Sequence, residues 1–301
     1  MLTVTLGLSA ALAYALSDFL AQRVTRGGAS VTSTLTWVLA TGTAVTVPAA
    51  LIGAGLPHGQ AELIDVGYAA AGGAAYLVAY GSLVRGLRGG NLSLVTPLAS
   101  LQGAVSAVGA VVLFGEHVTG ATAVGLALAV AGSATAARAP DAHGEERTGP
   151  SFATAEPDPD PDGIHLRAAA GAGWGLLCAL AFGIVLLFYG AAQSISPVTA
   201  VAVSRIVSLA LVLPLALHRG VHVPRKLRGT AVLSGALEAT GFLLVVLALA
   251  AGPVAVASVL VAQFATFAVL LGLVVGRERP SRVQLAGVVC TIVAVTVLAV
   301  A

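Results

Sequence analysis

The sequence predicts an all-α membrane protein of ten transmembrane helices, arranged as two inverted five-helix repeats. Three observations predict this fold. The composition is strongly apolar, ten long apolar runs alternate with short polar segments, and one pattern of residues recurs in both halves of the chain.

The composition excludes a water-soluble globular domain. Hydrophobic residues make up 57% of the 301 positions, charged residues only 9%, and the mean hydropathy is +0.96. Soluble domains carry about 25% charged residues, so this chain lacks the polar surface that water requires. A net charge of +2 without a basic patch argues against a nucleic-acid partner, and the expected partner is the lipid bilayer.

Ten apolar runs are long enough to cross a membrane. About 20 apolar residues are needed, because ~30 Å of hydrocarbon is crossed at about 1.5 Å per residue. The expected spans are 3–22, 31–54, 63–84, 91–114, 119–137, 168–190, 196–217, 229–250, 253–275 and 281–300.

The basic residues predict how these spans are oriented. Fourteen of the fifteen Lys and Arg residues fall in the odd-numbered loops, and loops rich in Lys and Arg face the cytoplasm. We therefore expect a multi-pass protein of the inner (plasma) membrane with both termini outside. The longest odd loop, residues 138–167, is rich in proline and acid and predicts a disordered cytoplasmic linker. It would separate a first repeat (1–137) from a second (168–301).

The two halves share a sequence pattern. A shift of 162 positions lays Gly90-Asn91-Leu92-Ser93-Leu94 on Gly252-Pro253-Val254-Ala255-Val256, and it also lays Glu116 on Glu278. A shift of 168 lays Ala11-Leu12-Ala13-Tyr14 on Ala179-Leu180-Ala181-Phe182. Each copy has five spans, an odd number, so the second copy must enter the membrane upside down. Inverted repeats of this kind are a common plan of secondary transporters.

These residues resemble the EamA-type members of the drug/metabolite transporter superfamily. The resemblance rests on Ala11–Tyr14 with Ser17-Asp18-Phe19, on residues 90–97, and on acidic turns at Phe114-Gly115-Glu116 and Gly276-Arg277-Glu278. It covers nearly the whole chain outside the linker, and Arg205 stands where many members have an arginine. The sequence departs from the pattern at two places. Val259 replaces Pro97 in the second half, so we expect that helix to be less broken. Tyr14 also stands where small four-helix relatives carry a glutamate.

The resemblance implies a transporter that exports a small metabolite, an amino acid-like compound or an amphipathic compound by alternating access. Protons are the candidate coupling ion, and no cofactor is expected. The first alternative is a membrane scaffold or lipid-handling protein without transport activity. An embedded enzyme is a weaker one, since the sequence has no phosphate-binding loop and no His/Cys/carboxylate cluster inside a span that suits a catalytic metal.

Three ionisable residues at membrane depth are candidate functional groups, because such residues are costly there. Glu238 lies ten residues beyond Arg228, about 15 Å deep, and Arg205 is expected at a similar depth. Burial of a carboxyl group favours its protonated form, which makes Glu238 a candidate for proton coupling. A structural ion pair with Arg205 is the alternative, and Arg205 could instead bind a substrate carboxylate. Asp18 is a second proton-coupling candidate, either at the inner mouth of a cavity or paired with loop arginines.

Further aromatic and amide residues are candidates for the wall of a substrate cavity, and the amides among them need partners inside a bilayer. Pro97 is a candidate hinge within the fourth span. The cavity candidates, besides Arg205, are Tyr14, Trp37, Tyr76, Tyr80, Gln102, Phe242 and Gln263.

Overall fold

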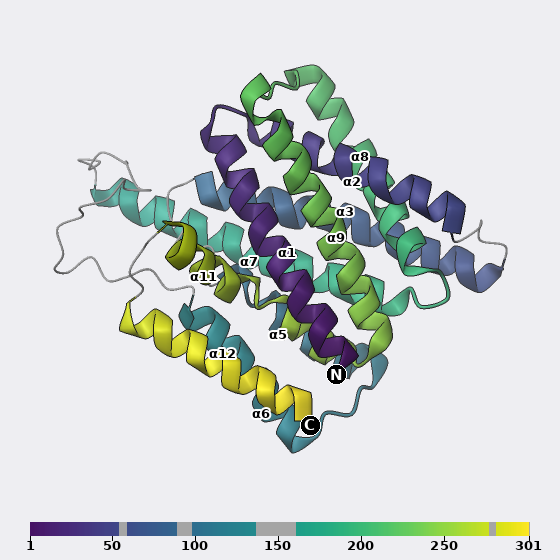
Figure 1. The fold of residues 1–301 in the computed structure, drawn as a ribbon, viewed down its shortest axis with the longest axis vertical. Helices are drawn as coiled ribbons and strands as arrows, with labels where there is room; N and C mark the ends of the chain where they lie inside the picture. Colours follow the sequence, from purple (N-terminus) through teal and green to yellow (C-terminus); the bar gives the residue numbers. More distant parts are fainter. Residues whose placement is uncertain (54–58, 89–97, 137–160, 277–280, 301) are drawn as a thin grey trace.

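The computed structural model describes residues 1–53, 59–88, 98–136, 161–276 and 281–300, and all regular elements in these ranges are helices (Figure 1). In chain order they are α1 (Leu2–Arg26), α2 (Val31–Gly53), α3 (Gln60–Arg88), α5 (Gln102–Phe114), α6 (Gly120–Ala136), α7 (Pro161–Ala191), α8 (Pro197–Arg219), the 3₁₀ turn η1 (Arg225–Leu227), α9 (Arg228–Ala251), α10 (Val254–Val261), α11 (Phe264–Gly276) and α12 (Arg282–Val300). The predicted all-helical membrane fold is confirmed.

The helices fall on the predicted spans. Six of them are long and apolar enough to cross a bilayer, and four shorter apolar helices lie within the remaining predicted spans. Large apolar side chains stand exposed on the outside of the bundle, such as Ile52 (89%), Val112 (73%) and Ile292 (60%). Such a surface suits hydrocarbon and not water.

Packing between the halves shows the symmetry of an inverted repeat. The sequence shifts make α7 the equivalent of α1 and α9 the equivalent of α3. In the structure α1 packs on α9 and α3 packs on α7, so each contact is the symmetry mate of the other. The contact of α3 with α8 is matched in the same way by that of α9 with α2, and two further contacts join equivalent helices, α2 to α8 and α6 to α12. The last pair lies side by side at one edge of the molecule (Figure 1).

A carboxylate clamp fixes the opposite direction of the two copies. Glu116 follows α5 and accepts hydrogen bonds from the first backbone amides of α10, from Val254 N at 2.5 Å and Ala255 N at 3.0 Å. A carboxylate at a helix N-terminus pairs with free N–H groups and with the helix dipole. Helix α5 ends the predicted fourth span and α10 begins the ninth, which is its repeat equivalent, so the end of one span meets the start of the other and the two run antiparallel.

The equivalent helices of the two halves are broken at equivalent residues. Turns interrupt the chain at Ser100-Leu101 and at Ala262-Gln263, which are 162 positions apart. At each break the amide bonds three residues back, from Leu101 N to the Leu98 carbonyl at 3.1 Å and from Gln263 N to the Leu260 carbonyl at 3.2 Å. Val259 replaces proline in the second half, and the helix is nevertheless interrupted three residues later.

Gln263 supplies the physical reason that no proline is needed. Its amide N–H bonds Leu260, which leaves the Val259 carbonyl without its usual helical donor. The side-chain Nε2 of Gln263 donates to that carbonyl at 3.0 Å and to the Ala129 carbonyl of α6 at 3.3 Å. The proposed hinge, Pro97, lies outside the described residues.

Helix α7 begins at Pro161, within the predicted linker (138–167), so its first turns extend beyond the predicted sixth span. Proline is common at the first position of a helix, where its missing N–H costs nothing. The rest of the predicted linker, 138–160, lies outside the described residues.

Two equivalent glycines let the halves approach closely. A Cβ atom on Gly73 of α3 would collide with the backbone of Ser204 in α8. One on Gly235 of α9 would lie 2.9 Å from the Val38 carbonyl in α2. The two glycines are 162 positions apart, so the contact of α3 with α8 and that of α9 with α2 are repeat equivalents. Small residues are common where membrane helices pack closely.

Gly73→Ala should lower the free energy of unfolding by about 1–3 kcal/mol, because backbone atoms of α8 cannot move aside easily. Unfolding in mixed micelles measures this loss. Gly67→Ala in the same helix is the matched control, since a Cβ there meets nothing within 4 Å. Equal stabilities for the two variants would contradict the close packing of α3 on α8.

Candidate functional site

A cavity lies where the two repeats meet. Its thirteen lining residues come from both copies. Ten of the thirteen form five pairs of repeat-equivalent residues: Tyr14/Phe182, Asp18/Leu186, Tyr76/Glu238, Tyr80/Phe242 and Gln102/Phe264. The cavity is therefore centred on the pseudo-two-fold axis, where inverted repeats place their binding sites.

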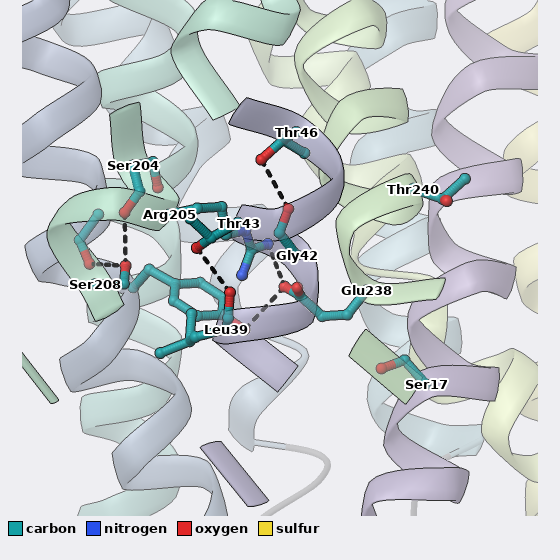
Figure 2. Close-up of polar contacts among 12 residues, drawn as sticks. Ser17, Leu39, Gly42, Thr43, Thr46, Ser204, Arg205, Ser208, Glu238 and Thr240 are labelled. Atoms are coloured by element: carbon teal, nitrogen blue, oxygen red, sulfur yellow. Dashed lines mark hydrogen bonds and ion pairs between the residues drawn. The ribbon is translucent and has the colours of Figure 1, made fainter. Parts of the chain in front are cut away.

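A buried ion pair stands beside the cavity. Arg205 Nη2 of α8 lies 2.5 Å from Glu238 Oε1 of α9, and both residues are 1% exposed. The two side chains point toward one another across the gap between their helices (Figure 2). Gly42 of α2 borders the guanidinium, where a Cβ atom would lie 3.5 Å from Arg205 Cδ.

Tyr76 connects this pair to the other repeat. Its hydroxyl group donates to the same oxygen, Glu238 Oε1, at 2.9 Å. Tyr76 and Glu238 are equivalent positions, so the hydrogen bond crosses the pseudo-two-fold axis. Of the two interpretations of Glu238, the geometry supports the ion pair with Arg205. The same carboxylate nevertheless lines the cavity.

Aromatic rings enclose the guanidinium. Arg205 Cζ lies 4.3 Å from the ring centroid of Phe242 and 4.8 Å from that of Tyr76. Phe242 also makes edge-to-face contacts with Tyr76, Tyr14 and Tyr189, at centroid distances of 4.9, 5.7 and 5.5 Å. Cation–π contacts of this kind stabilise a desolvated charge by about 2 kcal/mol.

Several polar atoms of the cluster make no hydrogen bond in the described part of the chain. They are Arg205 Nε and Nη1, Glu238 Oε2 and Tyr189 Oη, all of them buried. Unpaired polar atoms in a protein interior are costly, and natural proteins keep few of them. The cluster is thus costly to bury, which is typical of a functional position.

Asp18 lies in the cavity wall and is half-buried. No described residue forms an ion pair with it. The nearby arginines have other contacts: Arg23 Cζ lies 4.5 Å from the Phe19 ring centroid, and Arg85 Cζ lies 5.7 Å from that of Trp174. Of the two interpretations of Asp18, the geometry supports the one at the cavity.

The structure brings together most of the candidate residues but not all. Trp37 lies away from the cavity, beside a small apolar cluster of residues 24, 29, 223 and 231, with Arg228 Cζ 6.0 Å from its ring centroid. Gln263 closes the helix break and is not part of the cavity wall. The candidates that line the cavity are Tyr14, Asp18, Tyr76, Tyr80, Gln102, Glu238 and Phe242, and Arg205 lies beside it.

Sequence reasoning missed three lining residues that the repeat predicts. Phe182, Leu186 and Phe264 are the equivalents of Tyr14, Asp18 and Gln102, so the shifts of 168 and 162 could have found them. A buried residue outside the cavity wall, Asp65, was also missed. It is 7% exposed and accepts hydrogen bonds from the Ser194 amide, at 2.6 Å, and from the Ser194 hydroxyl group. This bond ties α3 to the loop after α7.

The described residues contain no group of three or more His, Cys, Asp or Glu side chains that could hold a metal ion. The chemistry available to the cavity is therefore that of aromatic rings, hydroxyl groups, an amide and two carboxylates.

Glu238→Leu should lower the free energy of unfolding by about 3–5 kcal/mol, because it leaves Arg205 buried without its partner. The double variant Arg205→Met/Glu238→Leu should recover most of that loss, since it removes both charges. Unfolding of the purified variants in mixed micelles measures both effects. A double variant no more stable than the single one would show that the pair is not the reason for the loss.

Comparison with known proteins agrees with this arrangement. The sequence profile of the EamA-like transporter family matches residues 1–137 and 169–300. Twenty-seven chains of known structure match the fold. One crystal structure has a TM-score of 0.74 at 17% sequence identity, with 99% of this chain and 98% of that one covered. No curated protein matches the sequence. The chain therefore belongs to the EamA-like transporter family of the drug/metabolite transporter superfamily, a family of multi-pass membrane transporters.

Proposed function

We propose that this protein is a secondary active transporter of the plasma membrane. It exports a small metabolite, an amino acid-like compound or an amphipathic compound by alternating access, and protons drive the export. The observation that carries the proposal is the cavity on the pseudo-two-fold axis, with five pairs of equivalent residues in its wall.

The symmetry of the wall supports alternating access. In an inverted repeat, one fold used in opposite senses provides two states of similar stability that open to opposite sides. Equivalent residues line the cavity from both repeats. When the two repeats exchange their conformations, the same side chains therefore remain in the wall. The helix breaks at 100–101 and 262–263 adjoin this wall and supply equivalent bending points.

The cluster around Glu238 supports proton coupling. Its carboxylate holds Arg205 of α8 and Tyr76 of α3 on one oxygen atom. A proton on Glu238 removes the negative charge that binds both Arg205 and Tyr76, and because the Tyr76 bond joins the two repeats, protonation and the contact between the repeats change together. Asp18 offers a second carboxylate in the same cavity.

Transport by the purified chain tests the proposal. Proteoliposomes are loaded with small molecules extracted from cells, a pH gradient is imposed, and mass spectrometry follows the contents. We expect loss of one or a few compounds that depends on both the protein and the gradient. Glu238→Gln should lose the dependence on the gradient but retain exchange, because the amide oxygen still accepts a bond from Arg205.

Glu62→Gln is the control, since Glu62 lies in α3 outside the cavity wall. Flux through the unmodified protein that does not depend on the pH gradient would contradict proton coupling. The absence of any protein-dependent flux would favour the scaffold or lipid-handling alternative.

A further inference from the structure

The charge of the cavity is one-sided. Glu238 is balanced by Arg205, whereas Asp18 has no ion-pair partner among the described residues. The repeat-equivalent of Asp18 is Leu186, so one copy contributes a carboxylate to the wall where the other contributes an apolar side chain. The described wall includes no Lys, Arg or His side chain. With Asp18 ionised, the charges of Asp18, Glu238 and Arg205 therefore leave the described cavity net negative.

The rest of the wall is aromatic. Aromatic residues make up 5% of the chain, yet six of the thirteen lining residues are Tyr or Phe. They are Tyr14, Tyr76, Tyr80, Phe182, Phe242 and Phe264. The face of an aromatic ring carries negative charge density and attracts cations. Within this cluster two of the rings already lie against a cation, the guanidinium of Arg205.

We propose that the cavity recognises an organic cation, with its ammonium group beside Asp18 and its apolar body among the aromatic rings. The proposal rests on the proposed function, because it names the substrate class of the same cavity. An anion of similar size would face both the carboxylate and the negative faces of the rings. An inorganic divalent cation is disfavoured, since such ions need several oxygen ligands and only one unpaired carboxylate is present.

Binding of two small probes tests the charge preference. Phenyltrimethylammonium and benzenesulfonate share a phenyl ring and a tetrahedral head group but carry opposite charges. Calorimetric titration uses the full chain in nanodiscs of phosphatidylcholine, whose zwitterionic surface favours neither probe. We expect phenyltrimethylammonium to bind about tenfold or more tightly than benzenesulfonate. Equal affinities, tighter binding of the anion or no binding of either probe would overturn the proposal.

Asp18→Asn should weaken binding of phenyltrimethylammonium by about tenfold, because it removes the charge and keeps the shape. Glu62→Gln removes a carboxylate outside the cavity and should leave the affinity unchanged. Full affinity in Asp18→Asn would overturn the assignment.

A second pair of variants tests the aromatic wall and does not depend on how Asp18→Asn folds. Tyr14→Phe keeps the ring face and should keep cation binding. Tyr14→Leu keeps an apolar side chain without a ring and should weaken binding about fivefold. Equal affinities of these two variants would exclude a cation–π contribution from Tyr14 and overturn that part of the proposal.

The transport assay separates this proposal from the proposed function. A neutral or anionic compound moved by the unmodified protein would overturn the organic-cation assignment and leave the transporter standing. Selective cation binding without flux of any compound would support the assignment and overturn transport.

Discussion

A buried ion pair between Arg205 and Glu238 constrains the whole structure. Both residues are only 1% exposed and lie inside a bundle surrounded by lipid. Their charges are tolerated there only because the two side chains form an ion pair with each other. The pair is held between α8 and α9, is joined to α3 through Tyr76, and is enclosed by aromatic rings. Gly42 and the close glycine contacts at 73 and 235 bring the surrounding helices near enough to seal it.

The chemistry of the cavity comes from departures from symmetry. An exactly repeated sequence would place matching side chains on both sides of the axis, and the charges of such a cavity could only come in pairs. Here Tyr76 faces its own equivalent, Glu238, so that a donor meets an acceptor across the axis. At the positions of Asp18 and Leu186 one copy contributes a carboxylate to the wall and the other an apolar side chain, and this leaves one carboxylate without a counterpart. The symmetric backbone provides the two states, and the asymmetric side chains provide the selectivity.

The sequence predicted what depends on hydrophobicity and repetition. Ten spans follow from the apolar runs, and the inverted architecture follows from an odd number of spans in each copy. It predicted less well what depends on local geometry. Gln263 was expected in the cavity because buried amides need partners, but backbone carbonyls at a helix break satisfy that need equally well. Trp37 was expected there as one of the aromatic residues of the spans, yet it packs near Arg228. When every face of a helix is apolar, the sequence of that helix says little about which side chains point into the cavity. Comparison with the equivalent residues of the other repeat does indicate it.

Access to the cavity from each side of the membrane tests the central claim most directly. Val261 lines the cavity and is 1% exposed, so Val261→Cys, in a chain whose Cys178 and Cys290 are replaced by alanine, reports on that space. A membrane-impermeant maleimide is applied to one face of sealed vesicles or to the other. The account predicts labelling from either face while the vesicles stay impermeable to the reagent. Labelling from one face alone under all conditions, or from neither, would contradict it.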